Sequence, residues 1–108
     1  HLLALPQPPT AILAADSPMA VGALATLNRR GLRIGRDMAL VAFDDIEWFS
    51  LLDPPLTVIS HDVEAMGRIA VGLLLDVIDG HRPESVVLPS KLIIRASSGT
   101  PDPTLGQP

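Results

Sequence analysis

The sequence predicts an α/β fold built on a parallel sheet. The run Leu40–Phe43 is short, apolar and uncharged, which is typical of a strand buried on both faces in a parallel sheet. Similar apolar runs alternate along the chain with two segments of helical periodicity, and this alternation is characteristic of α/β proteins. Asp44 and Asp45 directly follow Leu40–Phe43, at the carboxyl end of the strand, where ligands bind in open α/β sheets.

Composition limits the class of protein. A chain of 108 residues forms at most one small domain. Its net charge of −4 argues against binding to nucleic acid or to an anionic membrane by bulk charge. Cysteine is absent, which excludes disulfides and thiolate metal sites. No apolar run reaches the length of a membrane span, and no signal peptide opens the chain, which starts with His rather than Met. We therefore expect a piece of a longer protein with no membrane contact.

The first third of the chain is predicted as a helix end, a strand and a helix. His1–Leu5 is apolar and meets a run of prolines, which ends a helix. Ala11–Ala15 has the composition of a short buried strand. Ser17 precedes a proline and is the expected N-cap of a helix over Met19–Arg30. Gly31 is placed as its left-handed stop.

The remainder contains further strands and a second helix. Met38–Phe43 is the second strand, and Leu56–Ile59 is a short run that favours β structure. Ile46–Leu52 is a mixed acidic and aromatic stretch that ends at two consecutive prolines. Asp62–Asp79 has a wide apolar face and a polar stripe at helical spacing. The last predicted features are strands at Val86–Leu88 and Lys91–Arg95, and a disordered tail where the composition turns polar from Ala96.

No catalytic residue, metal site or cofactor site emerges from the motifs. No serine lies in a Gly-x-Ser-x-Gly elbow, the three histidines lack metal-ligand spacing, and no glycine-rich loop precedes a helix. Asp44 and Asp45, with Asp16, leave open an Mg²⁺ site. Carboxylates at strand ends also suit polyhydroxylated ligands, because an ionised acid accepts two hydroxyl hydrogens at once. Asp16 and Asp44 end neighbouring strands and are therefore expected to converge.

Seven stretches match a known protein family in its order and spacing. They are Pro9–Asp16, Met19–Leu24, Arg30–Ile34, Phe43–Asp45, Asp53–Thr57, Met66–Leu75 and Leu88–Pro89. Together they resemble the lactose/galactose repressor (LacI/GalR) family of bacterial transcription regulators. The resemblance runs from Leu2 to Ser97, nearly the whole chain.

The resemblance implies a type I periplasmic-binding-protein-like fold, with two lobes and a cleft between them. Residues 1–97 would form the C-terminal part of this effector-binding and dimerisation domain, mostly its C-terminal lobe. Residues 62–80 would be a helix that packs in the N-terminal lobe, and residues 98–108 a disordered tail. Thr57–Ser60 and Pro83–Val86 would cross between the lobes and are therefore hinge candidates.

The function implied by the resemblance is ligand sensing, not catalysis. A small effector, with a sugar as the expected class, would bind in the cleft and control operator DNA binding by a helix-turn-helix that is absent from this chain. The intact protein would be a cytoplasmic homodimer. Two alternatives stay open: a solute-binding protein of a sugar transporter, and a metal-dependent enzyme that uses Asp44 and Asp45.

The resemblance also assigns roles to individual residues. Asp44 keeps the acid that usually bonds the effector. Asp16 stands where the family typically has Asn, and Asp only accepts hydrogen bonds whereas Asn also donates them. Val63 matches a position that can pack against the ligand. Residues that match the usual dimer interface are Met19, Val21, Phe49 and Leu52.

Overall fold

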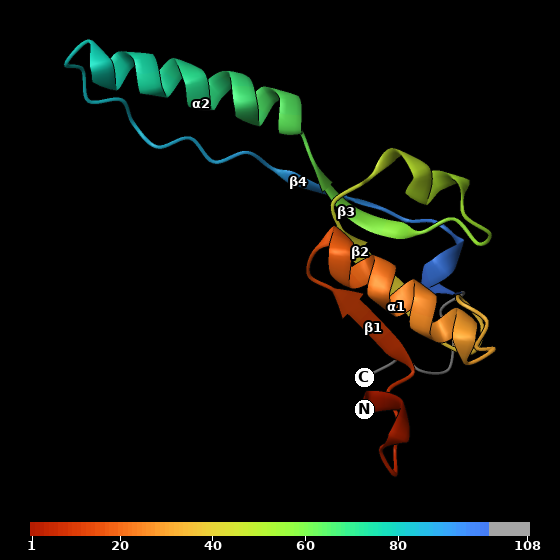
Figure 1. Cartoon of the computed structure of the whole chain (residues 1–108). Coiled ribbons are helices and arrows are strands. Elements are labelled where there is room, and N and C mark those ends of the chain that lie inside the picture. The colour runs from red at the N-terminus through yellow and green to blue at the C-terminus, as the bar shows by residue number, and fades with distance from the viewer. Residues whose placement is uncertain (100–108) are drawn as a thin grey trace, which may run out of the picture.

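The computed structural model describes residues 1–99, and a four-stranded sheet forms its centre (Figure 1). The strands lie in the order β1-β2-β3-β4. The first three are mutually parallel, and the last is antiparallel to its neighbour. The predicted α/β class with a parallel sheet is confirmed. The strand bounds are Ala11–Ala14 for β1, Ala39–Phe43 for β2, Thr57–His61 for β3 and Ser90–Ile93 for β4.

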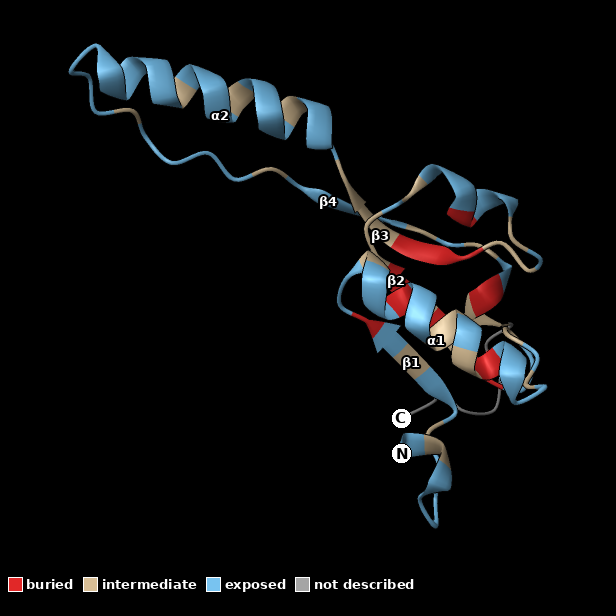
Figure 2. Cartoon of the chain, viewed as in Figure 1, coloured by how far each residue is buried: buried red, intermediate tan, exposed pale blue. Residues whose placement is uncertain are grey.

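The core lies around the central strand β2. Leu40 and Ala42 are fully buried, and the other β2 side chains are half-buried (Figure 2). The helix α1, Ser17–Arg29, packs on β1 and β2 through the buried side chains of Ala20 and Leu27. The helix predicted over Met19–Arg30 is thus confirmed, and aliphatic side chains make its contact with the sheet.

The two ends of α1 are defined by local chemistry. The N-cap is Asp16, whose Oδ1 atom accepts the backbone N–H of Met19 at 2.7 Å. The prediction that Ser17 caps the helix is therefore wrong, because Ser17 is already the first helical residue and its hydroxyl points elsewhere. At the other end Gly31 has φ +67°, which confirms the left-handed stop.

The second helix, α2, spans Val63–Ile78 and stands away from the sheet (Figure 1). Asp62 caps its first turn by accepting the N–H of Ala65 at 2.8 Å. None of its residues is buried, and it stretches the molecule to 57 Å in its longest dimension against 28 Å in its shortest. Its assignment to another lobe stays a prediction. Within residues 1–99, no helix combines the length and apolar character needed to cross a bilayer.

Two segments join α2 to the sheet, and one of them differs from the prediction. Thr57–Ser60 lies in β3, and the chain leaves the sheet at His61 and Asp62, so the crossings between lobes at Thr57–Ser60 and Pro83–Val86 stay predictions. Val86–Leu88 is not a strand. It runs back beside α2 (Figure 1), and Val86 and Leu88 line a hollow together with Met66 of that helix. Among the described residues no strand pairs with this segment, so its β-favouring composition does not produce a strand.

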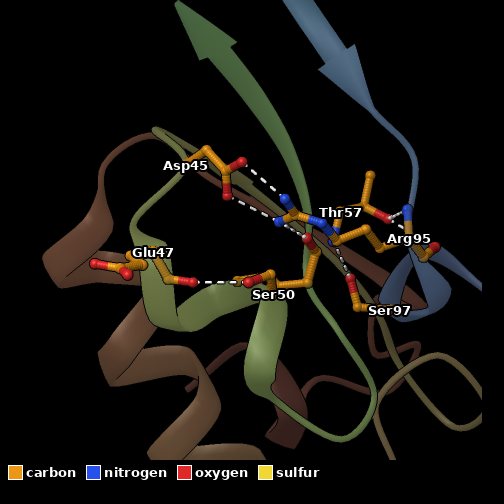
Figure 3. A network of polar contacts seen from close by, with 7 residues as sticks. Asp45, Glu47, Ser50, Thr57, Arg95 and Ser97 are labelled. Atoms are coloured by element: carbon orange, nitrogen blue, oxygen red, sulfur yellow. Dashed lines mark hydrogen bonds and ion pairs between the residues drawn. The ribbon is translucent and has the colours of Figure 1, made fainter. Parts of the chain in front are cut away.

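The segment after β4 returns to the centre of the sheet. Ala96–Ser98 forms the short 3₁₀ helix η3, and Ser97 is fully buried. The Ser97 hydroxyl donates to the Leu40 carbonyl at 2.6 Å. It also accepts the N–H of Thr57 at 2.7 Å (Figure 3). The expected disordered tail therefore does not begin at residue 96 or 98. The rest of that predicted tail, residues 100–108, lies outside the described residues.

Two further 3₁₀ turns complete the fold. Leu2–Ala4 forms η1, a single turn where a helix end was predicted. Glu47–Leu51 forms η2 within the acidic and aromatic stretch, and its Phe49 side chain is fully buried in the core.

Replacing Ser97 by Ala is expected to lower the free energy of unfolding by about 1–3 kcal/mol, because one buried carbonyl and one buried N–H lose their partner. Ser50→Ala is the matched control, since the exposed Ser50 hydroxyl only donates to the Glu47 carbonyl at 2.8 Å, and its effect should stay within about 0.5 kcal/mol. Urea unfolding measures both values. Equal losses in the two variants would contradict this role of Ser97.

Candidate functional site

Three polar side chains meet where the parallel strands end. Ser17 follows β1, Asp44 follows β2, and His61 is the last residue of β3. The Ser17 hydroxyl donates to Asp44 Oδ2 at 3.3 Å. On the other side His61 Nδ1 lies 3.6 Å from Asp44 Oδ1. We call these residues the Ser17–Asp44–His61 cluster.

The backbone holds Asp44 at the centre of this cluster. Its φ of +70° is in the left-handed region, where residues other than Gly are uncommon. Its N–H donates to the Ile59 carbonyl at 2.9 Å, which ties the turn after β2 to β3. The Asp44 side chain remains 41% exposed, whereas that of His61 is only 18% exposed. The carboxylate is therefore accessible to a ligand while its imidazole neighbour is held in place.

The neighbouring aromatic ring limits the freedom of His61. The centroid of the Phe43 ring lies 5.9 Å from that of the imidazole, with a tilt of 40°. With its Nδ1 atom toward Asp44 and a ring against Phe43, the imidazole has a defined orientation. It can act as hydrogen-bond donor, acceptor or, when protonated, as the cation of an ion pair.

The expected convergence of Asp16 and Asp44 on one ligand stays a prediction. Asp16 itself uses Oδ1 to cap α1, and the adjacent Ser17 hydroxyl makes the contact with Asp44. The sequence predicted a capping role for Ser17 and no metal-ligand role for His61, and neither residue was predicted as part of the site. Their positions at the ends of two predicted strands were the available signal for both.

Asp45 has a structural partner. Its two carboxylate oxygens accept from Arg95 Nη1 at 2.8 Å and Nη2 at 2.7 Å (Figure 3). Asp44 and Asp45 therefore do not form a pair of acids facing one ion. Residues 1–99 contain no group of three or more His, Cys, Asp or Glu side chains placed to hold a metal ion. The geometry gives the Mg²⁺ hypothesis no support.

A hollow of about 410 Å³ lies beside the cluster, where the chain passes from β3 into α2. His61, Asp62 and Lys91 contribute its polar lining, and Leu88 and Pro89 part of its apolar lining. His61 thus belongs to both the cluster and the hollow. Val63, the first residue of α2, has 69% of its surface exposed, and its role as a ligand contact stays a prediction.

The residues predicted for a dimer interface divide into two groups. Met19 and Val21, in the first turns of α1, are exposed, and Leu52 is half-buried. Phe49 is fully buried and packs edge-on against Trp48, with ring centroids 4.6 Å apart. Phe49 is therefore excluded from a surface role, because its side chain belongs to the core of its own chain.

The chain is similar to known proteins over most of its length. Residues 1–98 match the family model of the periplasmic binding protein-like domain. The transcriptional repressor CytR of Escherichia coli is 41% identical over 91% of this chain, and the chain spans 29% of CytR. The lactose operon repressor of Rhizobium radiobacter is 41% identical over 93% of this chain and 89% of that sequence. The crystal structure of a Lac repressor dimer bound to operator and the anti-inducer ONPF superposes with a TM-score of 0.75, at 36% identity, over 85% of this chain and 28% of that one.

Replacing Asp16 by Ala is expected to lower the free energy of unfolding by about 1 kcal/mol, because the first turn of α1 loses its cap. Asp16→Asn should cost less than Asp16→Ala, since Asn is an equally good cap. Thermal or urea unfolding of both variants measures the difference. Equal destabilisation by Asn and Ala would contradict the capping role.

Proposed function

The chain belongs to the LacI/GalR family of transcriptional regulators through its periplasmic-binding-protein-like domain, and on this premise we propose that it forms one wall of the effector-binding cleft of a repressor. The observation that supports this most is the Ser17–Asp44–His61 cluster. It lies at the carboxyl ends of parallel strands, where ligands of open α/β sheets bind. Asp44, the central effector contact in the proposal, is accessible from solvent.

The chemistry of the cluster favours a neutral ligand that carries several hydroxyl groups. The Asp44 carboxylate accepts hydroxyl hydrogens, and Ser17 and His61 can each donate or accept. Asp16 and Asp62 lie beside the cluster in sequence, and among residues 1–99 Lys91 is the one cation that lines the adjoining hollow, so the acidic groups here outnumber the basic ones. This excess of acidic groups opposes phosphorylated or carboxylated effectors. A neutral sugar fits best, and Val63 offers an exposed apolar surface near the same edge.

The mode of action that we propose is a change in lobe geometry. The chain leaves the sheet at His61 and Asp62 and returns at Ser90, so α2 and the sheet are joined through two narrow segments. An effector that contacts both lobes would stabilise one relative orientation of the two. Through this preference it would change the affinity of a helix-turn-helix outside this chain for operator DNA, in the cytoplasm.

The named relatives favour a regulator over the two alternatives. CytR and the lactose operon repressors are described as repressors, which gives no support to a solute-binding protein of a transporter. The metal-dependent enzyme would need both Asp44 and Asp45, and Asp45 is engaged by Arg95.

We also propose a homodimer. The Lac repressor in the crystal structure cited above is a dimer bound to operator, and Met19 and Val21 expose apolar side chains on α1 of the present chain. The interface would use these two residues with Leu52, and without Phe49.

Asp44→Ala in the full-length gene product is expected to weaken effector binding by about 1–3 kcal/mol, as for the loss of a hydrogen bond to a charged group. A thermal-shift screen of neutral mono- and disaccharides, with free nucleobases as a second class, would identify the effector, and calorimetry would give the dissociation constants. Asp37→Asn, which removes a carboxylate near the opposite end of β2, is the control and should leave the dissociation constants unchanged. An unchanged constant in Asp44→Ala would contradict the site.

Met19→Glu should shift the full-length protein toward monomer, because it introduces a charge into the proposed apolar interface. Arg29→Glu, at an exposed position of the same helix about 80° around its axis from both Met19 and Val21, is the control and should leave the dimer intact. Light scattering coupled to size-exclusion chromatography measures both masses. A Met19→Glu protein that remains fully dimeric at micromolar concentration would exclude this residue from the interface.

A further inference from the structure

Asp44 adopts a backbone conformation that its surroundings must maintain. It is the one non-glycine residue among residues 1–99 with a positive φ, at 70°. A Cβ makes this conformation sterically unfavourable, although Asp adopts it more readily than most residues do. It persists only where neighbouring contacts fix it, and the direction of the carboxylate depends on it.

Two contacts fix the turn that contains Asp44. The first is its own N–H, which donates to the Ile59 carbonyl of β3 at 2.9 Å. The second acts on the next residue, since both oxygens of Asp45 accept from the guanidinium of Arg95 at 2.7 and 2.8 Å (Figure 3). Arg95 follows β4, so the turn after β2 is held from two other strands.

Arg95 is itself firmly anchored. Its Nη1 atom also donates to the Leu56 carbonyl at 2.9 Å. Its backbone N–H donates to Thr57 Oγ1 at 2.8 Å, and its carbonyl accepts from the same hydroxyl at 2.9 Å (Figure 3). The side chains of Arg95 and Asp45 are only 18% and 21% exposed. A bidentate ion pair that is shielded from solvent in this way holds both side chains in one defined geometry. The hydrogen bonds with Asp45 raise the pKa of Arg95.

We propose that Arg95 and Asp45 are positioning residues for Asp44. The bidentate hydrogen bonds of the Arg95 guanidinium hold Asp45, so that Asp44 keeps its left-handed backbone and presents its carboxylate between Ser17 and His61. In this proposal neither Arg95 nor Asp45 contacts the ligand. The inference rests on the proposed function only in taking Asp44 as the effector contact.

The chain contains a second pair of the same chemistry, which makes a matched comparison possible. Arg33 Nε and Nη2 donate to Asp37 at 2.8 Å each. This pair lies before β2, at the opposite end of the strand from Asp44. The Arg33 hydrogen bonds hold the pKa of Asp37 well below its usual range. Asp37→Asn therefore removes a bidentate ion pair of the same chemistry, although a more exposed one, without touching the Asp44 turn.

The test is hydrogen–deuterium exchange of the Asp44 amide, read at single-residue resolution in the full-length protein without any effector. The quantity compared is the Asp44 ratio, the exchange rate of the Asp44 amide divided by the mean rate of the Leu40–Ala42 amides. In Asp45→Asn this ratio should rise about tenfold or more, because loss of the charge-assisted bidentate hydrogen bonds releases the turn. Arg95→Lys, which keeps the charge but not the bidentate hydrogen bonds, should give a smaller change in the same ratio. Asp37→Asn should leave the ratio unchanged.

Either of two results would overturn the proposal. One is an Asp44 ratio that stays at the wild-type value in both Asp45→Asn and Arg95→Lys. The other is equal acceleration at Asp44 and at Leu40–Ala42, which would mean that the pair only stabilises the whole fold. Since no effector is present, failure of the proposed function leaves this result unaffected. A released turn together with unchanged sugar affinity in Asp45→Asn would instead count against Asp44 as the contact.

Discussion

Burial of β2 inside the sheet is the constraint on which the rest of the structure depends. β2 pairs with parallel strands on both sides, and the side chains of Leu40 and Ala42 are excluded from water. An ionised carboxylate cannot lie within such a strand without a large desolvation cost, so acids occur only past its end. Because the parallel strands β1–β3 all end at the same edge, the polar residues that follow them are brought together there. The Ser17–Asp44–His61 cluster is a consequence of this arrangement.

The acidic residues at this edge have different partners and therefore different roles. Asp16 caps a helix, and Asp45 is held by a guanidinium. Asp44 keeps an exposed carboxylate whose polar side-chain contacts within residues 1–99 are a hydroxyl and an imidazole. Neither contact compensates its charge as fully as the Arg95 guanidinium compensates that of Asp45. An accessible, weakly paired carboxylate on a rigid edge is suited to bind the hydroxyl groups of a ligand.

Local sequence patterns were sufficient to predict most of the helices and strands, but not the contacts between segments that are distant in the sequence. The uncharged run Leu40–Phe43, the stop at Gly31 and the periodicity of Asp62–Asp79 each depend on neighbours in the chain, and each was predicted correctly. The burial of Ser97 was missed because it depends on Leu40 and Thr57, distant in sequence. The predicted strand at Val86–Leu88 failed for the same kind of reason, since a strand requires a partner that composition does not supply.

The candidate site was predicted in the same partial way. Asp44 was identified because a carboxylate directly follows a buried strand, and the structure places it in a polar cluster at that edge. Its partners were not identified, because which side chains reach Asp44 depends on the order of the strands. Capping was assigned to the wrong one of two adjacent residues, since both Asp16 and Ser17 have the chemistry of an N-cap. Only the backbone geometry at the start of α1 distinguishes them.

The most direct test of Asp44 as the effector contact is a crystal structure of the full-length protein with the sugar that raises its melting temperature. We expect a ligand hydroxyl at about 2.5–3.0 Å from an Asp44 carboxylate oxygen, with Asp44 still in the left-handed region. A sugar bound elsewhere, with the Asp44 carboxylate facing only solvent, would contradict the proposed site.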